Sequence, residues 1–189
     1  MYFYKGKKYN VQKLYEGGRY YVYLLTLVDK ENDKIVLKID MQTPENYRTS
    51  QILNEYLIQS LVAIYEYQLV TISDSNRLTP YEHRLSRCPP KKLGAIMPYL
   101  GESIIKCPIN MLENSWNQVL EQLKELHEIG IIHNDIKPEN ILRLGDKTSI
   151  IDYGLSQCLH DFNPQPGGTM TYMSPRAHLG KSSSRRCIT

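Results

Sequence analysis

The chain has 189 residues, of which 41% are hydrophobic and 23% are charged. This composition is typical of a soluble globular protein and argues against wholesale disorder. The formal net charge of +3 is too small to indicate a nucleic-acid partner, and no run of about 18 apolar residues predicts a membrane span. The four cysteines are widely scattered, so we expect reduced thiols and an intracellular protein, in the cytoplasm or the nucleus.

The first third of the chain predicts β-strands. Residues 9–29 are rich in Tyr, Val and Leu, and the Gly17-Gly18 break within them indicates a hairpin. The segment IVLKID at 35–40 predicts a short strand with one lysine inside an apolar run. After Pro44, helical spacing of apolar residues predicts the first helix.

Two more strands and a long loop follow. IYEYQLV at 64–70 and LGAIMPYL at 93–100 predict strands. Residues 73–92 are polar and carry several basic side chains. We interpret them as a solvated loop between two strands rather than as a patch that binds a partner.

The second half of the chain changes period. Apolar side chains recur at the spacing of an amphipathic helix that Gly130 ends; they are Trp116, Val119, Leu120, Leu123 and Leu126. IIHNDIKPENILRL at 131–144 and TSIIDYGLS at 148–156 predict short strands separated by polar loops, and the tail from residue 160 is expected to be irregular. A β-rich lobe followed by a helical lobe predicts an α+β fold.

Polar residues suited to phosphoryl transfer lie in the second half. Asp135 and Asn140 have the D-x-x-x-x-N spacing, in which the Asp accepts a substrate hydroxyl proton and the Asn holds a metal ion. Asp152, in the DYG step, provides a second hard oxygen ligand for Mg²⁺. We therefore expect Asn140 and Asp152 to bind the metal.

Two residues of the first half complete the pattern. Lys38 lies in the strand IVLKID and is expected to bind the α and β phosphates of a nucleotide, and Glu55, 17 residues later, is expected to pair with it. Each of these residues alone has a plainer interpretation, since a lysine in a strand is usually a surface residue and an Asp-x-Gly step is usually a turn. The order and spacing of the whole set favour catalysis.

The chain resembles the eukaryotic protein kinase family from about residue 10 onward. Within that family it resembles the branch of casein kinase one and the vaccinia-related kinases. Four segments carry this finer resemblance: DYG, MPYLGESI, GTMTYMSPRAHLG and SSSRR. The resemblance implies a bilobal protein-kinase-like fold with an N-lobe at 1–97 and a partial C-lobe at 98–189, which would contain the hinge, the catalytic loop, the DYG step and the activation segment.

The same resemblance implies further site residues. Lys137 would neutralise the transferring phosphate, and Lys137 and Thr169 match the pattern of serine/threonine kinases. ATP and Mg²⁺ would be bound and a protein would be the substrate. The residues implied to contact ATP are Gly17, Gly18, Val22, Val36, Lys38, Met97, Tyr99, Leu100, Leu142 and Ile151.

The sequence departs from the family pattern in several places. Of the three glycines of the loop that covers the phosphates, only Gly17 is in register, although Arg19 beside it could compensate. Asn134 replaces an arginine that pairs with a phosphorylated activation loop, which predicts activity independent of such phosphorylation. Thr171 stands where casein kinase one enzymes carry an anion-binding arginine, so a preference for prephosphorylated substrates is not expected.

The resemblance also implies a truncation after the activation segment. The family would continue beyond Arg186 with helices that support the catalytic loop, so the incomplete C-lobe is expected to be marginally stable, prone to aggregate or dependent on a partner chain that covers it. Arg176 stands at the position of the glutamate in the family's A-P-E step. It is weak evidence for a loss of function, because the branch often lacks that glutamate. Two alternatives to a serine/threonine kinase therefore stay open: a non-catalytic kinase-like module that docks on a kinase or its substrate, and a remnant without a stable fold.

Overall fold

The computed structural model describes residues 1–17, 19–41, 50–62, 65–72, 77–80, 92–159 and 167–179. The chain divides into two compact units, Met1–Tyr99 and Leu100–Thr189. Each unit is described by itself below.

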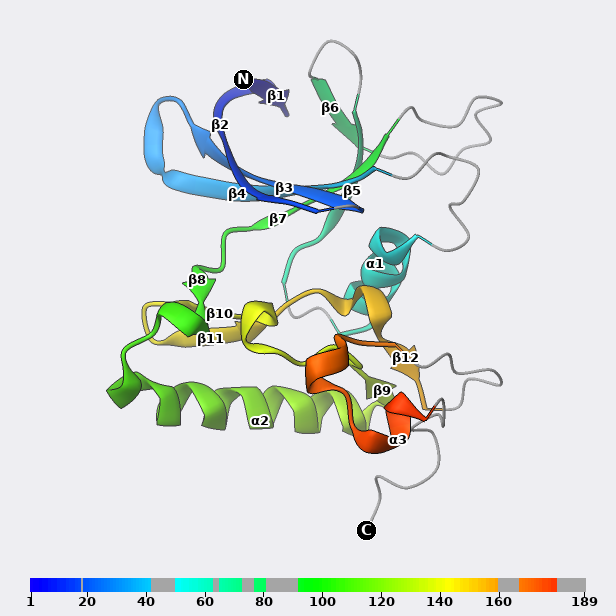
Figure 1. The fold of residues 1–189 in the computed structure, drawn as a ribbon. Coiled ribbons are helices and arrows are strands. Elements are labelled where there is room, and N and C mark those ends of the chain that lie inside the picture. The colour runs from blue at the N-terminus through cyan, green and yellow to red at the C-terminus, as the bar shows by residue number, and fades with distance from the viewer. Residues whose placement is uncertain are drawn as a thin grey trace. The chain divides into compact units, whose positions relative to one another are not determined.

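The first unit is built on a closed β-barrel (Figure 1). Its strands are β1 (Tyr2–Tyr4), β2 (Lys7–Glu16), β3 (Tyr20–Leu27), β4 (Lys30–Asp40), β5 (Gln68–Ile72), β6 (Arg77–Pro80) and β7 (Leu93–Pro98). They follow the order β1-β2-β3-β4-β7-β5-β6, and the parallel pairing of β1 with β6 closes the barrel. One helix, α1 (Gln51–Val62), lies between β4 and β5 in the sequence.

Strand alternation separates the barrel core from a polar face. Leu37 and Ile39 of β4 lie in the hydrophobic core, whereas Lys38 between them points to the opposite face of the sheet. The core is aliphatic and aromatic, and its buried members are Tyr4, Tyr9, Leu25, Leu27, Leu37, Ile39, Val70, Leu78 and Ile96. Burial of this apolar surface is the main force that stabilises the unit.

The structure corrects several sequence-based expectations in this unit. Residues 73–92 are not a loop throughout, because β6 (Arg77–Pro80) pairs with both β5 and β1. The strand expected at 64–70 begins at Gln68, and β1 was not expected. The hairpin of β2 and β3 is confirmed. Gly18, Pro44 and the start predicted for the first helix lie outside the described residues.

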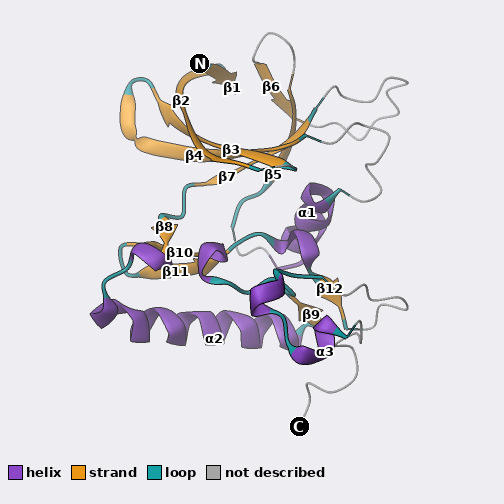
Figure 2. Cartoon of the chain, in the orientation of Figure 1, coloured by secondary structure: helices purple, strands orange, loops and turns teal. Residues whose placement is uncertain are grey.

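The second unit is dominated by one long helix, coloured purple in Figure 2. Its α-helices and strands are α2 (Leu112–Glu128), β8 (Glu102–Ser103), β9 (Ile131–Ile132), β10 (Ile141–Leu144), β11 (Lys147–Ile150), β12 (Gln157–Cys158) and α3 (Pro175–His178). Single 3₁₀ turns connect them: η2 (Ile104–Lys106), η3 (Ile109–Met111), η4 (Pro138–Asn140), η5 (Tyr153–Leu155) and η6 (Met170–Tyr172). The expectation of short strands separated by polar loops is confirmed for 131–156.

Helix α2 packs against β11, and only part of its predicted apolar stripe is buried. Ser115, Val119 and Leu126 are buried, and Gln122 donates hydrogen bonds to main-chain carbonyls, one of them that of Thr148 at 2.9 Å. Trp116 and Leu120, which the sequence places on the apolar face, are 42% and 61% exposed. The helix itself is confirmed, but these two side chains are exposed rather than buried among the described residues.

The structure tests the predictions on the C-terminal tail and on the cysteines only in part, because some of these residues lie outside the described ranges. Of the tail expected to be irregular, residues 167–179 are described, and they contain η6 and α3. Cys107 and Cys158 are free thiols, while Cys88 and Cys187 lie outside the described residues. Among the helices that the structure describes, none combines the length and the apolar character needed to cross a membrane.

Candidate active site

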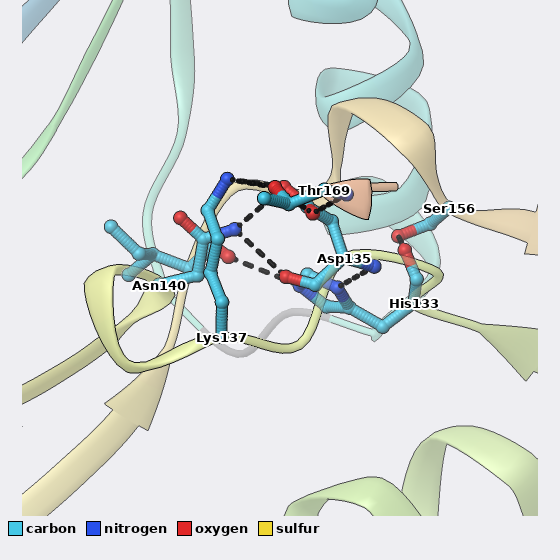
Figure 3. Close-up of polar contacts among 7 residues, drawn as sticks. His133, Asp135, Lys137, Asn140, Ser156 and Thr169 are labelled. Atoms are coloured by element: carbon cyan, nitrogen blue, oxygen red, sulfur yellow. Dashed lines mark hydrogen bonds and ion pairs between the residues drawn. The ribbon is translucent and has the colours of Figure 1, made fainter. Parts of the chain in front are cut away.

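The carboxylate of Asp135 is the centre of a hydrogen-bonded cluster in the second unit (Figure 3). Asp135 follows the short strand β9, and the turn η4 brings Asn140 back toward it. Lys137 Nζ donates to Asp135 Oδ2 at 2.8 Å, and Asn140 Nδ2 donates to the same atom at 3.1 Å. The D-x-x-x-x-N spacing therefore closes into one compact loop around a single carboxylate.

Thr169 reaches this carboxylate from a distant segment. Its main-chain N–H and its hydroxyl both donate to Asp135 Oδ1, at 2.8 and 2.7 Å. Its hydroxyl oxygen accepts from Lys137 Nζ at 2.8 Å. The preceding Gly168 has a φ of +129°, and a Cβ there would lie 2.5 Å from the carbonyl oxygen of Asn134. Only glycine permits this approach, so Gly168 is required for Thr169 to reach Asp135.

The cluster keeps Asp135 negatively charged. The residue is only 6% exposed, and burial alone would raise the pKa of its carboxyl group. The hydrogen bonds from Lys137 and Thr169 and the charge of Lys137 outweigh burial, so the pKa lies below the ordinary value of 3.8. At neutral pH the site therefore offers an ionised carboxylate, with a lysine ammonium 2.8 Å away.

His133 anchors the start of this loop. The ring is 1% exposed, its Nδ1 accepts from the main-chain N–H of Asp135 at 3.2 Å, and its Nε2 lies 3.0 Å from the carbonyl oxygen of Ile151. Because Nδ1 accepts, Nε2 carries the proton and donates. Burial lowers the pKa of His133 below its ordinary 6.5 despite the opposing effect of the Ile151 carbonyl, so the ring is neutral. His133 thereby ties Asp135 to the strand end that precedes Asp152.

Asn134 shapes the backbone between His133 and Asp135. It has a φ of +66°, in the left-handed region that asparagine tolerates better than most residues. Its Nδ2 donates to the carbonyl oxygen of Leu155 at 3.1 Å. The residue that replaces the family's arginine thus binds the main chain just after the DYG step.

Asn140 and Asp152 provide the oxygen atoms that a hard cation requires. Asn140 Nδ2 donates to both the carbonyl and the carboxylate of Asp135, so its Oδ1 is the atom of that amide left for a metal ion. Asp152 has a φ of +65° and is half-buried. The main-chain bond from Ile151 N to Asn140 O, 2.9 Å, fixes the two segments side by side. These residues fit Mg²⁺, which takes few protein ligands and keeps several waters.

In the first unit, Lys38 and Glu55 form the pair that the sequence predicted. Lys38 Nζ lies 3.1 Å from Glu55 Oε2, and the two residues are 7% and 1% exposed. Hydroxyl groups of two tyrosines also donate to Glu55: Tyr65 to Oε1 and Tyr67 to Oε2, each at 3.1 Å. The role of Lys38 in phosphate binding stays a prediction.

The residues expected to line an adenine pocket fall into two groups. In the first unit, strand register places Val22, Val36 and Met97 on the same sheet face as Lys38, because Val22 pairs with Lys38 and Val36 pairs with Met97. Tyr99 and Leu100, which the resemblance implies as the hinge, follow β7 and are half-buried. In the second unit, Leu142 and Ile151 are half-buried as well. Their contact with a nucleotide is a prediction.

The turn at Gly17 is occupied by aromatic side chains. Tyr15 folds over Gly17, so that a Cβ on Gly17 would meet its ring. The ring of Tyr20, at the position of a family glycine, lies 4.7 Å from Lys38 Nζ and 5.3 Å from the guanidinium carbon of Arg19. Two cations therefore gather on one aromatic ring at this turn.

Sequence reasoning missed the residues that support the site from outside the motifs. Tyr65 and Tyr67 were interpreted as part of an apolar strand, although the Tyr-Glu-Tyr alternation places both rings on one side. Ser156, whose hydroxyl donates to the carbonyl of His133 at 3.3 Å, carried no signal of its own. Gly168 stands directly before Thr169 in the sequence, but its close approach to the main chain of Asn134, which requires glycine, shows only in the structure.

The amino-acid sequence is similar to those of known protein kinases. The family description "Protein kinase domain" matches residues 10–186. A probable serine/threonine-protein kinase of Encephalitozoon cuniculi is 41% identical over 66 residues, which are 35% of this chain and 13% of that protein. A putative serine/threonine-protein kinase of Invertebrate iridescent virus 3 is 33% identical over 84 residues, 41% of this chain and 25% of that protein.

One relative aligns with nearly the whole chain. The dual specificity protein kinase Ttk of Danio rerio is 24% identical over 186 residues, which are 95% of this chain and 18% of that protein. The chain thus spans about a quarter or less of the length of these curated relatives. The match of the family description covers nearly all of the chain and includes both the Lys38–Glu55 pair and the Asp135 cluster. This chain belongs to the protein kinase family.

Proposed function

We propose that this chain transfers the γ-phosphoryl group of ATP to a serine or threonine hydroxyl of a protein substrate. The observation that carries the proposal is the Asp135 cluster: a buried, ionised carboxylate with Lys137 and Asn140 in direct contact and Thr169 on its other oxygen. We assign the first unit as the kinase N-lobe and the second as a part of the C-lobe.

Asp135 positions the attacking group in this proposal. The substrate hydroxyl donates to the Asp135 carboxylate, a new bond forms between its oxygen and the γ-phosphorus, and the bond from that phosphorus to the β–γ bridging oxygen breaks. The hydroxyl proton passes to Asp135, and ADP leaves with the bridging oxygen. Lys137 lies 2.8 Å from the carboxylate and supplies positive charge to the transferring group.

The remaining residues bind ATP and Mg²⁺. The metal ion neutralises charge on the phosphates, and Asn140 Oδ1 and the Asp152 carboxylate would hold it. Lys38, kept in place by Glu55, binds the α and β phosphates. Val22, Val36 and Met97, which share a sheet face with Lys38, would contact the adenine ring, and so would Tyr99, Leu100, Leu142 and Ile151.

The branch within the family is a finer proposal. DYG, MPYLGESI and GTMTYMSPRAHLG support a place near casein kinase one and the vaccinia-related kinases. The Danio rerio relative is named a dual specificity protein kinase, and that description applies to the relative itself. If the branch assignment holds, Thr171 in place of an anion-binding arginine implies substrates that need no prior phosphorylation.

A second candidate function is a non-catalytic module that docks on another protein. The exposed side chains of Trp116 and Leu120 on α2 favour it, because large apolar residues gathered on one helix face suit a protein partner. A partner chain of this kind would cover α2. The retention of Asp135, Lys137 and Asn140 in one hydrogen-bonded cluster favours catalysis over docking alone.

A phosphate-transfer assay tests the proposal. The purified chain is incubated with γ-labelled ATP, Mg²⁺ and dephosphorylated casein, and the labelled residues are identified after acid hydrolysis. We expect label on serine or threonine, and none with Asp135→Ala. Label that persists in the variant comes from a contaminating kinase and contradicts the proposal, and so does the absence of label from both proteins when ATP binds.

A further inference from the structure

Two tyrosine hydroxyl groups hold the carboxylate of Glu55 in the first unit. Tyr65 donates to Oε1 and Tyr67 donates to Oε2, each at 3.1 Å, and Lys38 Nζ donates to Oε2 at the same distance. The tyrosines are 9% and 8% exposed, and Glu55 is 1% exposed. The carboxylate therefore has a donor on each oxygen in a site that water barely reaches.

The chain just before β5 places both rings on one side. Tyr65 and Tyr67 are buried and the intervening Glu66 is exposed, which is the alternation of an extended chain. The two rings pack with their centroids 6.3 Å apart at 47°. A tyrosine hydroxyl at the end of a packed ring has little freedom, because only two side-chain torsions move it. Packing of the rings thus restricts where the two hydroxyl donors lie.

This arrangement determines where Lys38 can lie. A carboxylate held only by Lys38 could rotate and carry the ammonium group with it. With Tyr65 on Oε1 and Tyr67 on Oε2, the plane of the carboxylate is set, and Lys38 Nζ is directed to one oxygen. Because both charges are buried, a loss of their alignment is costly.

We infer that Tyr65 and Tyr67 are positioning residues, which act through Glu55 to hold Lys38 where a nucleotide phosphate binds. The inference rests on the proposed ATP-binding function and deepens it. All four residues, Lys38, Glu55 and the two tyrosines, belong to the first unit, so this positioning needs no residue of the second unit.

The test removes one hydroxyl at a time and compares two ligands. Tyr65→Phe and Tyr67→Phe keep the rings and their packing. We expect each to weaken the binding of Mg·ATP about three- to tenfold, the range for one hydrogen bond, with adenosine affinity unchanged. Tyr9→Phe, at a buried tyrosine of the barrel core, is the matched control and should leave both affinities unchanged. Isothermal titration calorimetry measures all of them.

A double-mutant cycle separates positioning from a general structural effect. In a Glu55→Ala background the hydroxyls have no carboxylate to hold, so Tyr67→Phe should no longer change Mg·ATP affinity. If Glu55→Ala does not fold, Lys38→Met serves as the background, because it removes the cation and leaves the hydroxyl–carboxylate contacts. The inference would be overturned if Tyr67→Phe lowered Mg·ATP affinity equally in the wild-type background and in the Glu55→Ala or Lys38→Met background. A parallel loss of adenosine affinity would also overturn it.

The outcomes distinguish this inference from the proposed function. Wild-type protein that binds Mg·ATP, with Tyr→Phe variants of unchanged affinity, overturns the inference and leaves the function standing. Wild-type protein that is folded but binds neither Mg·ATP nor adenosine overturns both. Selective loss of Mg·ATP affinity in the two variants, abolished in the Glu55→Ala background, supports both.

Discussion

Two buried carboxylates organise this molecule, and they differ in what surrounds them. Asp135 gathers its donors from a loop of a few residues and from Thr169, and its lysine partner is 20% exposed at the side chain. Glu55 gathers donors from β4 and from the chain before β5, and its lysine partner is 8% exposed. Asp135 thus stands beside a side chain that solvent reaches, whereas Glu55 is enclosed on all its polar atoms.

The difference separates two kinds of role. A carboxylate beside a partly exposed lysine can receive a proton from a substrate hydroxyl, which is the task proposed for Asp135. A carboxylate that is 1% exposed and paired with a lysine almost as buried as itself is suited instead to positioning that lysine. Removing Asp135 should therefore stop the chemical step, and removing Glu55 should first damage folding and nucleotide binding. The following predictions test this contrast, from the largest expected effect to the smallest.

Asp135→Asn should lower the rate of phosphate transfer about 100- to 10,000-fold, because the amide cannot accept the substrate proton. It should also cost about 1–3 kcal/mol in the free energy of unfolding, because an amide nitrogen then faces the donors Lys137 or Thr169. Glu139→Gln, at an exposed carboxylate of the same loop, is the control and should keep the wild-type rate. Equal rates for wild type and Asp135→Asn would contradict the assignment.

Glu55→Ala should lower the free energy of unfolding by about 3–5 kcal/mol, measured by urea denaturation. The substitution leaves the buried ammonium of Lys38 without its carboxylate partner. Glu66→Ala lies between the two tyrosines on the exposed side and should change stability by less than about 1 kcal/mol. Similar losses of unfolding free energy in Glu55→Ala and Glu66→Ala would show that the buried ion pair contributes no more to stability than an exposed glutamate does.

Thr169→Val should lower the rate of phosphate transfer about ten- to a hundredfold. It removes the hydroxyl that donates to Asp135 and accepts from Lys137, while the main-chain N–H still donates to Asp135. Thr169→Ser keeps the hydroxyl and should retain most of the activity. If Thr169→Ser is as slow as Thr169→Val, the methyl group rather than the hydroxyl matters.

The smallest effect is a pH dependence that belongs to His133. Burial lowers its pKa below 6.5, so the unfolded chain binds more protons than the folded chain once the pH falls to that range. Stability should then be lost as the pH falls from 6.5 toward the folded pKa. Thermal melts between about pH 7.5 and 5.5 should show a steeper loss for wild type than for His133→Gln. Parallel curves would exclude His133 as the source.

Local spacing made the Asp135 loop predictable. Asp135, Lys137 and Asn140 lie within six residues, so a single turn brings them together, and the sequence shows that turn through Pro138 at the start of η4. Lys38 and Glu55 were predictable from order along the chain, and their ion pair is present. The Asp135 contacts depend on a short motif that the sequence displays directly, whereas the Lys38–Glu55 pair was predicted from the order of the whole set of residues.

Features that depend on distant pairing were not predictable. Strands β1 and β6 close the barrel by pairing with each other, and at three and four residues both are too short to show a clear strand pattern. The packing face of α2 is another example, because Ser115 and Val119 are buried while the more apolar Trp116 is exposed. Tyr65 and Tyr67 have a role only because the fold brings Glu55 to them.

Thermal unfolding with and without Mg·ATP tests the division of roles between the two carboxylates most directly. It compares wild type with Asp135→Asn and Glu55→Gln, the latter chosen because it keeps the side-chain volume. The account predicts that Mg·ATP raises the melting midpoint of wild type and of Asp135→Asn by similar amounts and raises that of Glu55→Gln much less. A nucleotide shift that is absent in wild type, or one that is lost in Asp135→Asn and kept in Glu55→Gln, would contradict it.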